Sequence, residues 1–508
     1  MPLVVTGAVV PLYVLWALVL ATGGGDLAAQ YAWAGFFERH PGAAYNLSWY
    51  GGMHTANYSL LTPPLMALLG VRAVSVAAGL AGTWLLSLLC VRRGVRYPLW
   101  PALAGALALW CNVASGRTTF AVGVAVGLAA VLYAQRASLA AVCAALATAA
   151  SPVAGLFLLV VGAAYGPARQ WRRAAVLVLP PVAVVGAVTL LFPFEGEQPM
   201  AAGKVWLPVV VSAAVAVAAP RGWRVVRYGA GIYGVGVVLT YLIASPIGTN
   251  VERLLGLAGP PVLLAAVLAR GGARTLRALL AAALVVNAYW LTDKTEDDLV
   301  VSTDVPAWAA HTDGVVAELE RLGADRMRVE VVPARNHREA TALAPHVNMA
   351  RGWNRQLDVE RGRLFYDGSL SPATYRAWLD RWAVGLVVLH HGRPDGPAEG
   401  EAAIVRGEPE WLDRVWRDAH WTVYQVRDAV PLAGAPASVV RGDDAELVVR
   451  MPRAGSVTVR VAYSPWLRAK GACVRPDGAW TRLTVPHAGV YRLDSAYRLD
   501  RSAGAHCD

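Results

Sequence analysis

The sequence predicts a polytopic α-helical membrane protein with about 10–11 membrane segments and a C-terminal extracytoplasmic domain of α/β plus β-sandwich type. Hydrophobic residues make up 56% of the 508 residues and charged residues only 16%, whereas soluble proteins have about 45–50% apolar and about 25% charged residues. The excess is uneven, because residues 1–293 form a series of apolar runs while 294–508 resemble an ordinary soluble domain. We therefore expect a transmembrane domain over 1–293, with a large outer loop over 22–70.

About 20 apolar residues cross the hydrocarbon core of a bilayer. By this criterion the membrane segments lie near residues 3–21, 72–90, 98–113, 118–134, 138–165, 174–192, 204–219, 228–245, 254–269 and 276–292. The first segment does not resemble a signal peptide, since it lacks a basic leading region.

The segment 138–165 is predicted to be broken. It would be about 42 Å long as one helix, and Pro152 follows Ser151 near its middle. Proline interrupts a helix by removing a donor and clashing with the preceding turn. Two half-length helices would return the chain to the side from which it came, an arrangement tolerated only where the break is buried in protein or lines a cavity. A single long tilted helix is the alternative.

With that fold-back, the arginines of the short loops fall on one side of the membrane. They are Arg92, Arg93, Arg96, Arg136, Arg169, Arg172, Arg173, Arg221, Arg224, Arg227, Arg270, Arg274 and Arg277. Only Arg39, Arg72, Arg117, Lys204 and Arg253 fall on the other side. The positive-inside rule then predicts a multi-pass bacterial plasma-membrane protein with a cytoplasmic N-terminus and an extracytoplasmic tail. The net charge of +11 is explained by topology, so no nucleic-acid partner is expected.

The outer loop from Thr22 to Gly70 is too long and too polar for a simple connection. Asp26 follows the first span directly, and Glu38 is a second acid in the same loop. The loop also carries Tyr45, Trp49, Tyr50, His54 and Tyr58. Carboxylates among aromatic rings beside a bilayer are typical of a site that handles a polar group attached to a lipid. Alternatively, Asp26 caps the next helix, as Asp often does.

The later outer loops add further candidates. Glu195 and Glu197 lie in FPFEGEQPM and are second-acid candidates. Asn250 ends a predicted tight turn, and Arg253 opens the following span. An isolated Arg at this depth usually extends its side chain to the interface, but beside such a turn it can bind a phosphate with two hydrogen bonds.

The tail divides into an α/β region over 294–430 and a β-rich region over 431–508, the latter with short alternating segments typical of a small sandwich. One short region concentrates polar and aromatic residues: His337, Arg338, Glu339, Arg351, Trp353, Arg355 and Asp358. These are either solvated surface charges or, for Arg351, Trp353 and Arg355, ligands of a sugar or phosphate. Cys473 and Cys507 are the only cysteines of the tail, and an oxidising compartment would allow a disulfide between them.

The sequence contains no P-loop, dinucleotide fingerprint, HExxH or GxSxG motif in a suitable context. Instead it has Asp26 after the first span, then Tyr45 and Trp49-Tyr50, then Tyr58 with Pro63-Pro64 and Gly70. This order resembles the GT-C superfamily of integral-membrane glycosyltransferases that use polyprenyl-phosphate sugars, and in particular its actinobacterial mannosyl- and arabinosyltransferase-like members. In that superfamily an acid opens the first outer loop and an aromatic interfacial helix follows. The usual acidic pair is reduced here to Asp26 followed by Leu27.

The resemblance implies transfer of a sugar from a polyprenyl-phosphate donor to a cell-envelope glycan, lipid or protein. Asp26 would accept the proton of the acceptor hydroxyl or hold a divalent cation, Mg²⁺ or Mn²⁺, against the phosphate. Arg117 or Arg253 would offset charge on the leaving group. No cofactor is certain.

Two other classes stay open: a multi-span transporter or flippase of the MFS-like kind, and a non-catalytic envelope assembly protein. A transporter should show mirrored broken helices, and a glycosyltransferase an outer cavity lined by Asp26. A scaffold should show neither feature.

Overall fold

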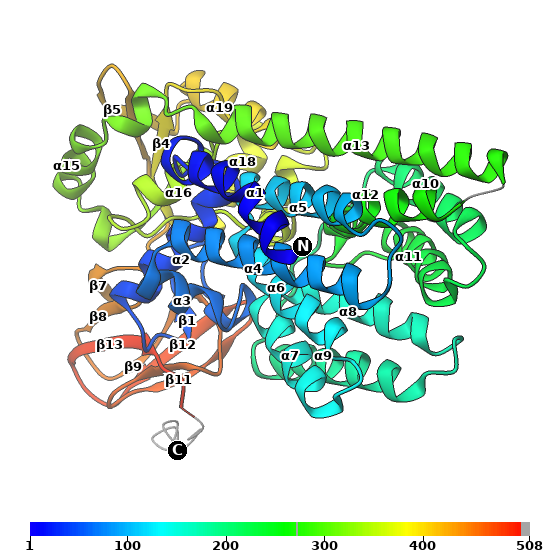
Figure 1. The fold of residues 1–508 in the computed structure, drawn as a ribbon. Helices are drawn as coiled ribbons and strands as arrows, with labels where there is room; N and C mark the ends of the chain where they lie inside the picture. The colour runs from blue at the N-terminus through cyan, green and yellow to red at the C-terminus, as the bar shows by residue number, and fades with distance from the viewer. Residues whose placement is uncertain (271–272, 499–508) are drawn as a thin grey trace. The chain divides into compact units, whose positions relative to one another are not determined.

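Two units make up the described residues, 1–270 and 273–498, of the computed structural model (Figure 1). The helical unit comprises Met1–Thr22 and Tyr58–Thr303, and the α/β unit comprises Gly23–Asn57 and Asp304–Asp508. The predicted outer loop is therefore divided between the two units.

Six helices of the helical unit are long and apolar enough to cross a membrane. They span Pro2–Leu20 (α1, Pro2–Leu15, with the π-helical turn Trp16–Leu20), Val71–Arg92 (α4), Trp171–Leu191 (α9), Arg224–Leu242 (α11), Gly248–Ala269 (the 3-10 turn Gly248–Val251 with α12, Glu252–Ala269) and Arg274–Thr303 (α13). Shorter helices accompany them: α3 (Thr62–Leu69), α5 (Leu99–Ala114), α6 (Thr118–Leu132), α7 (Ala137–Ala150), α8 (Pro152–Tyr165) and α10 (Trp206–Ala218). Large apolar side chains face outward, such as Leu190 at 83% exposure, as expected of a surface that contacts lipid. The predicted polytopic class is confirmed.

The predicted break in the fifth segment is also confirmed. α7 ends before Ser151, whose backbone is extended (φ −156°, ψ 114°), and α8 begins at Pro152. A Cβ built on Gly155 would lie 2.6 Å from the side chain of Thr148. The two halves therefore pack against each other as a hairpin instead of continuing one long helix.

Backbone groups that the break frees are hydrogen-bonded within the helical unit. The carbonyl of Ala149 accepts from the Leu60 N–H at 3.0 Å. The carbonyl of Ala150 accepts from the hydroxyls of Ser59 at 2.8 Å and Thr62 at 3.3 Å. Because a buried helix end needs such partners, the segment that leads into α3 closes the turn between α7 and α8.

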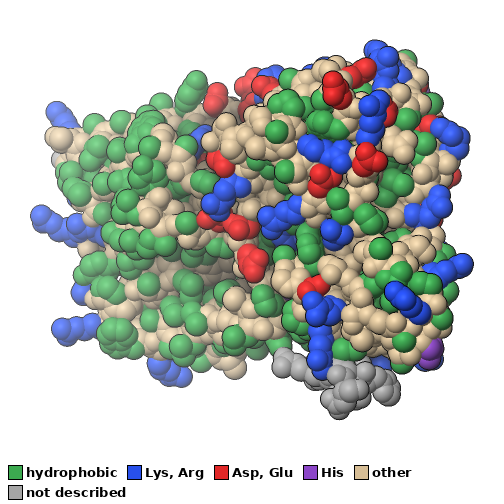
Figure 2. All heavy atoms as spheres, turned by 180° about the vertical axis from the view of Figure 1, so that it is seen from behind, with side chains coloured by type: hydrophobic (Ala, Val, Ile, Leu, Met, Phe, Trp, Pro, Cys, Tyr) green, Lys and Arg blue, Asp and Glu red, His purple; other side chains and the backbone are tan. Residues whose placement is uncertain are grey.

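One end of the helical unit is basic. Arg92 and Arg136 both lie over the Tyr133 ring, at 5.8 and 6.0 Å from its centroid. Arg270 donates to the carbonyls of Ala218 and Ala219 at 2.8 and 3.0 Å. Figure 2 shows Lys and Arg side chains at its left edge, beside a broad belt of hydrophobic side chains. The structure thus brings together the loops that the charge pattern places on one side.

α13 has 30 residues and is about 45 Å long, which exceeds the roughly 30 Å of a hydrocarbon core. Its last third therefore continues past the apolar layer. The predicted end of the membrane domain, residue 293, lies inside this helix.

The α/β unit contains a four-stranded sheet in the order β3-β4-β6-β5, in which β3 and β4 are parallel and the other pairs antiparallel. Its strands are β3 (Arg328–Val331), β4 (Val384–His390), β5 (Leu412–Arg417) and β6 (Trp421–Val426). Its helices are α14 (Ala307–Ala310), α15 (Asp313–Arg321), α16 (Glu339–Ala342), α17 (Arg355–Arg361), α18 (Pro372–Arg381) and α19 (Glu399–Arg406). Tyr375, Trp378 and Leu379 of α18 are buried in the core beside β4.

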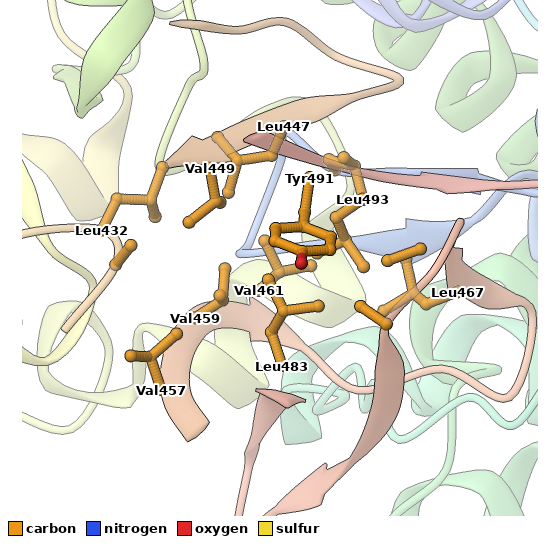
Figure 3. Packing of buried hydrophobic residues seen from close by; sticks show 14 of the residues in the cluster. Leu432, Leu447, Val449, Val457, Val459, Val461, Leu467, Leu483, Tyr491 and Leu493 are labelled. Carbon is orange, nitrogen blue, oxygen red and sulfur yellow. The ribbon is translucent and has the colours of Figure 1, made fainter. Parts of the chain in front are cut away.

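Two antiparallel sheets form the predicted sandwich, in the orders β10-β13-β8-β7 and β11-β12-β9. The strands are β7 (Ser438–Gly442), β8 (Leu447–Met451), β9 (Gly455–Ala462), β10 (Leu467–Ala469), β11 (Cys473–Asp477), β12 (Trp480–Val485) and β13 (Gly489–Ser495). Figure 3 shows Val449 and Tyr491 of one sheet and Val461 and Leu483 of the other in a shared apolar core. Alternating inward-facing residues produce such a core.

Residues 23–57 belong to the same unit. They form α2 (Asp26–Arg39), the short strands β1 (Tyr45–Asn46) and β2 (Met53–His54), and a 3-10 turn, Thr55–Asn57. The Leu47 N–H donates to the Asp444 carbonyl at 2.8 Å, and the Ala462 N–H donates to the Gly51 carbonyl at 2.7 Å. This part of the predicted loop is thus integrated into the sandwich.

Candidate functional site

Asp26, the predicted catalytic acid, is the first residue of α2 and is half-buried. The cap position is occupied by Gly25, which makes no side-chain capping bond. Asp26 therefore lies in the first turn, one position beyond the cap. A carboxylate there is favoured in its charged form by the helix dipole.

The backbone before Asp26 is held on both sides. The Gly25 N–H donates to the Asn336 carbonyl at 2.7 Å, and the Trp353 indole Nε1–H donates to the Gly25 carbonyl at 3.0 Å. Gly25 has φ 62° and ψ −137°, a conformation open essentially to glycine alone. Trp353 thus positions the chain at Asp26.

The ring of Trp353 has aromatic and cationic partners. His337 stacks on it, with ring centroids 3.5 Å apart and planes at 17°, and the Arg355 guanidinium lies 5.1 Å from its centroid. Arg355 also donates to Asp395 at 2.7 Å and to the Tyr366 hydroxyl at 2.8 Å. Burial would raise the pKa of Asp395, but the charges of His337 and Arg355 outweigh it and hold that pKa below its usual value.

Arg351, by contrast, is an internal residue of the α/β unit. Only 2% of it is exposed. Its guanidinium donates to Glu330 at 2.7 Å and to Glu401, which also accepts from the Tyr375 hydroxyl at 2.7 Å. Desolvation opposes charge on Arg351, but the surrounding carboxylates outweigh it and raise its pKa well above the usual value. Arg351 thus lies among buried acids inside the α/β unit, and its predicted substrate contact stays a prediction.

Four predicted aromatic or imidazole ligands are also buried inside the α/β unit: Tyr45, Trp49, Tyr50 and His54. The Tyr50 hydroxyl donates to the Gly352 carbonyl at 2.7 Å. His54 Nε2 lies 2.9 Å from the Ser464 hydroxyl oxygen. These residues lie in and around the β1–β2 hairpin, and they join it to the rest of the unit instead of forming the interfacial helix that the resemblance implies.

A second group of polar residues lies in the helical unit, at the end away from the basic loops. Arg117 precedes α6, and its guanidinium lies 2.7 Å from the Asp298 carboxylate on α13. Lys294, one turn earlier on α13, interacts electrostatically with Arg117, Asp298 and Glu252. Glu252 opens α12, is only 4% exposed and is also within electrostatic reach of Lys204.

The predicted Asn250–Arg253 turn lies in the same unit. The Asn250 amide donates to the Gln198 side-chain oxygen at 3.0 Å, and the Gln198 amide donates to the Thr249 hydroxyl at 2.7 Å. The Arg253 guanidinium lies 5.4 Å from the centroid of the Phe120 ring on α6. Tyr58, which begins this part of the helical unit, is half-buried.

The sequence reasoning missed Glu252, Lys294, Asp298 and Gln198. Lys294 and Asp298 are four residues apart, the spacing that places two side chains on one helical face. That spacing was the available signal, but the charged stretch around them resembles a loop that follows a span.

The other acid candidates lie elsewhere. Glu38 is exposed near the C-terminal end of α2, Glu195 is exposed in the loop before α10, and Glu197 is half-buried there. Cys473 is buried in β11, while Cys507 lies outside the described residues, so the disulfide stays a prediction.

Within the described residues, one trio has atoms close enough to hold a metal ion: His40, Asp443 and Asp444. Asp444 already accepts from Arg39 at 2.6 Å and pairs with His40 at 2.8 Å. The hydrogen bond to Asp444 raises the pKa of His40. This trio is an ion-paired cluster at the opposite end of α2 from Asp26.

Residues 434–477 match a domain of unknown function (DUF8823). No curated protein matches the chain.

Two solved structures of the mycobacterial arabinofuranosyltransferase AftD are similar to this chain. One is 16% identical with a TM-score of 0.45, covering 91% of this chain and 41% of that chain. The other, a mutant, is 12% identical with a TM-score of 0.43, covering 97% of this chain and 60% of that chain. This chain thus spans only part of those proteins, and its function has to be argued from its own residues.

Proposed function

We propose that this chain is a membrane glycosyltransferase that takes a sugar from a polyprenyl-phosphate donor on the outer face of a bacterial plasma membrane. The observation that supports this proposal most directly is a group of four cationic side chains at the end of the helical unit away from the basic loops. Arg117 precedes α6 and Arg253 lies in the first turn of α12. Lys294 lies on α13, and Lys204 precedes α10. Four cationic side chains from four segments, with Glu252 and Asp298 among their charged neighbours, suit a phosphate at the level of the lipid headgroups.

The proposed chemistry assigns separate tasks to these residues. Arg117, Arg253 and Lys294 stabilise negative charge that develops on the leaving polyprenyl phosphate. Asp26 accepts the proton of the acceptor hydroxyl as the new glycosidic bond forms. Trp353 and Asn336 hold the backbone before Asp26 and act as positioning residues. The acceptor class is a cell-envelope glycan, lipid or protein.

A divalent cation is a further part of the proposal. Mg²⁺ commonly uses one or two protein carboxylates together with substrate phosphate oxygens. Within the described residues Asp26 is not part of a three-ligand group, so a cation there would depend on the donor phosphate. Removal of free metal with EDTA is accordingly expected to reduce transfer, with recovery on addition of Mg²⁺ or Mn²⁺.

The transporter alternative is less well supported. α7 and α8 have 14 residues each and turn back on each other at Ser151–Pro152. The helices with internal proline pairs, α9 and α12, are continuous. An inverted-repeat carrier is expected to have a mirrored second hairpin, and neither α9 nor α12 is broken into such a pair.

The experiment is transfer of radiolabelled sugar from a panel of polyprenyl-phosphate donors by the purified chain. Asp26→Asn is expected to lower transfer by at least about 100-fold, in the range of a lost general base, and Glu38→Gln on the same helix is expected to leave it unchanged. If no donor reacts, the glycosyltransferase proposal fails. Substrate uptake in proteoliposomes would then test the transporter class. Normal transfer by the Asp26→Asn variant would instead overturn the proposed catalytic role of Asp26.

A further inference from the structure

A cavity of about 750 Å³ lies inside the helical unit. It is lined by residues of α4, α5, α6, α8, α9, α10, α11 and α12, most of them apolar, and Asp26 is not among them. The lining follows α8 from Ala154 to Tyr165, a distance of about 16 Å along a helix. Half of a 30 Å hydrocarbon core is about 15 Å. The cavity therefore has the depth of one leaflet of a bilayer.

One end of this cavity lies at the basic end of the helical unit. Arg93, Arg173 and Arg224 line it there. Arg93 donates to the Val131 carbonyl at 3.3 Å, and Arg173 donates to the Gln170 side chain. Neither these two nor Arg224 forms an ion pair with a carboxylate within residues 1–270 and 273–498. The surrounding segments 92–98, 133–137, 166–173, 219–227 and 269–277 contain no Asp or Glu at all.

We propose that the cavity binds an anionic glycerophospholipid from the leaflet at the basic end, with its phosphate against Arg93, Arg173 and Arg224 and an acyl chain along α8. Charge complementarity favours this occupant, because basic pockets between membrane helices are suited to anionic headgroups. A wholly apolar molecule would leave three guanidinium groups without a counter-charge. A polar solute would leave the apolar wall without a partner.

This lipid site is separate from the proposed donor site. Arg117 and Glu252 begin helices whose C-terminal ends reach the basic loops, so the two sites lie at opposite ends of the same helices. The bound lipid would fill the space between α4–α8 and α10–α12. We expect it to stabilise the native helical unit, as does any ligand that binds the folded state alone.

The test is titration of the full-length protein, in detergent, with phosphatidylglycerol and with phosphatidylcholine, followed by native mass spectrometry. The wild type is expected to retain phosphatidylglycerol in preference. The triple variant Arg93→Gln, Arg173→Gln, Arg224→Gln is expected to bind it roughly 100-fold more weakly, if each arginine near a headgroup contributes about fivefold. The matched triple variant Arg96→Gln, Arg172→Gln, Arg221→Gln removes three exposed arginines of the same end that do not line the cavity, and it should bind like the wild type.

Equal loss in both triple variants would mean that general surface charge holds the lipid, and the proposal would be overturned. Equal retention of both lipids by the wild type would overturn the assigned headgroup class. Gly229→Leu tests the apolar wall, since a Cβ there would lie 3.4 Å from Ala164, an ordinary contact. This variant should keep its fold and bind less phosphatidylglycerol, and unchanged binding would contradict an acyl chain in the cavity.

Discussion

At the scale of single residues, the stability of an Arg351 variant distinguishes a structural ion cluster in the core from a substrate-binding site. Removal of one partner from a buried ion pair leaves an uncompensated charge and costs about 3–5 kcal/mol. We expect Arg351→Leu to destabilise the α/β unit by this amount, because Glu330 and Glu401 are fully buried. The exposed pair Arg427–Asp413 is the control, and Arg427→Leu should cost at most about 1 kcal/mol. Thermal unfolding followed by tryptophan fluorescence measures both. An Arg351→Leu protein as stable as the control would contradict this structural role and favour the predicted substrate contact.

His390 gives the α/β unit a pH dependence. It is fully buried and stacks on Trp308, and its Nδ1 accepts from the Gly392 N–H at 3.0 Å. Burial lowers its pKa from 6.5 to about 4. Between these values the unfolded chain binds a proton that the folded chain does not, so stability falls as the pH falls. The loss approaches about 3 kcal/mol by pH 4.

His390→Gln should therefore lose less stability than the wild type between pH 7 and pH 5, even if its stability at pH 7 is lower. His346→Gln removes an exposed histidine and should keep the wild-type slope. Unfolding midpoints at a series of pH values measure this difference. Identical slopes for all three proteins would assign the acid sensitivity to other groups.

At the scale of elements, the α7–α8 hairpin depends on close packing against α6. A Cβ added at Gly123 would lie 2.7 Å from the Ala154 Cβ, 2.8 Å from the Ser151 Cβ and 3.1 Å from the Ala147 carbonyl oxygen. These atoms are fixed by backbone, so the neighbours have little freedom to move. We expect Gly123→Ala to cost about 1–3 kcal/mol, as overpacked cores do.

Gly231→Ala on α11 is the same chemical change at a site with no atom within 4 Å, and it should be neutral or stabilising because Ala favours a helix. The melting temperatures of the two variants, measured in one detergent, test this difference in stability. If both behave alike, α6 does not pack on the hairpin as described.

The same hairpin shows what sequence reasoning can reach. Pro152 and the arginine pattern identify the break, because both are local signals that need no knowledge of neighbours. The continuation of α13 past residue 293 is different. Lys294 and Asp298 resemble the start of a loop, and their helical state is supported by Arg117, about 180 residues away. Interactions over such separations leave no local pattern.

At the scale of the whole molecule, the division of the outer loop was equally hidden. The β1–β2 hairpin has only two residues in each strand, and its hydrogen bonds reach segments about 400 residues later. A short apolar-aromatic stretch after a membrane span resembles an interfacial segment as much as part of a sandwich. The sequence thus identified Asp26 and the aromatic residues as noteworthy, but the burial of those aromatics follows from tertiary packing.

Orientation in the membrane is the property on which the proposed donor and lipid sites both depend. The positive-inside rule predicts that the basic end faces the cytoplasm. The chain leaves the helical unit after Thr22 and after Thr303, and Thr22 is hydrogen-bonded to the carbonyls of Ser302 and Thr303 at 2.8 and 2.9 Å. These crossing points lie at the ends of α1 and α13 remote from the basic loops, so the α/β unit should be extracytoplasmic.

Cysteine labelling tests this orientation in living cells, in a background with all five cysteines replaced by Ser. Ser369→Cys is exposed in the α/β unit, and it should react with a membrane-impermeant maleimide in intact cells. Arg96→Cys at the basic end should react only after permeabilisation. The reverse result would place the α/β unit in the cytoplasm, where Asp26 could not serve an extracytoplasmic transfer and the anionic lipid would have to come from the outer leaflet. A single labelling experiment therefore decides whether both proposed sites face the compartments that their chemistry requires.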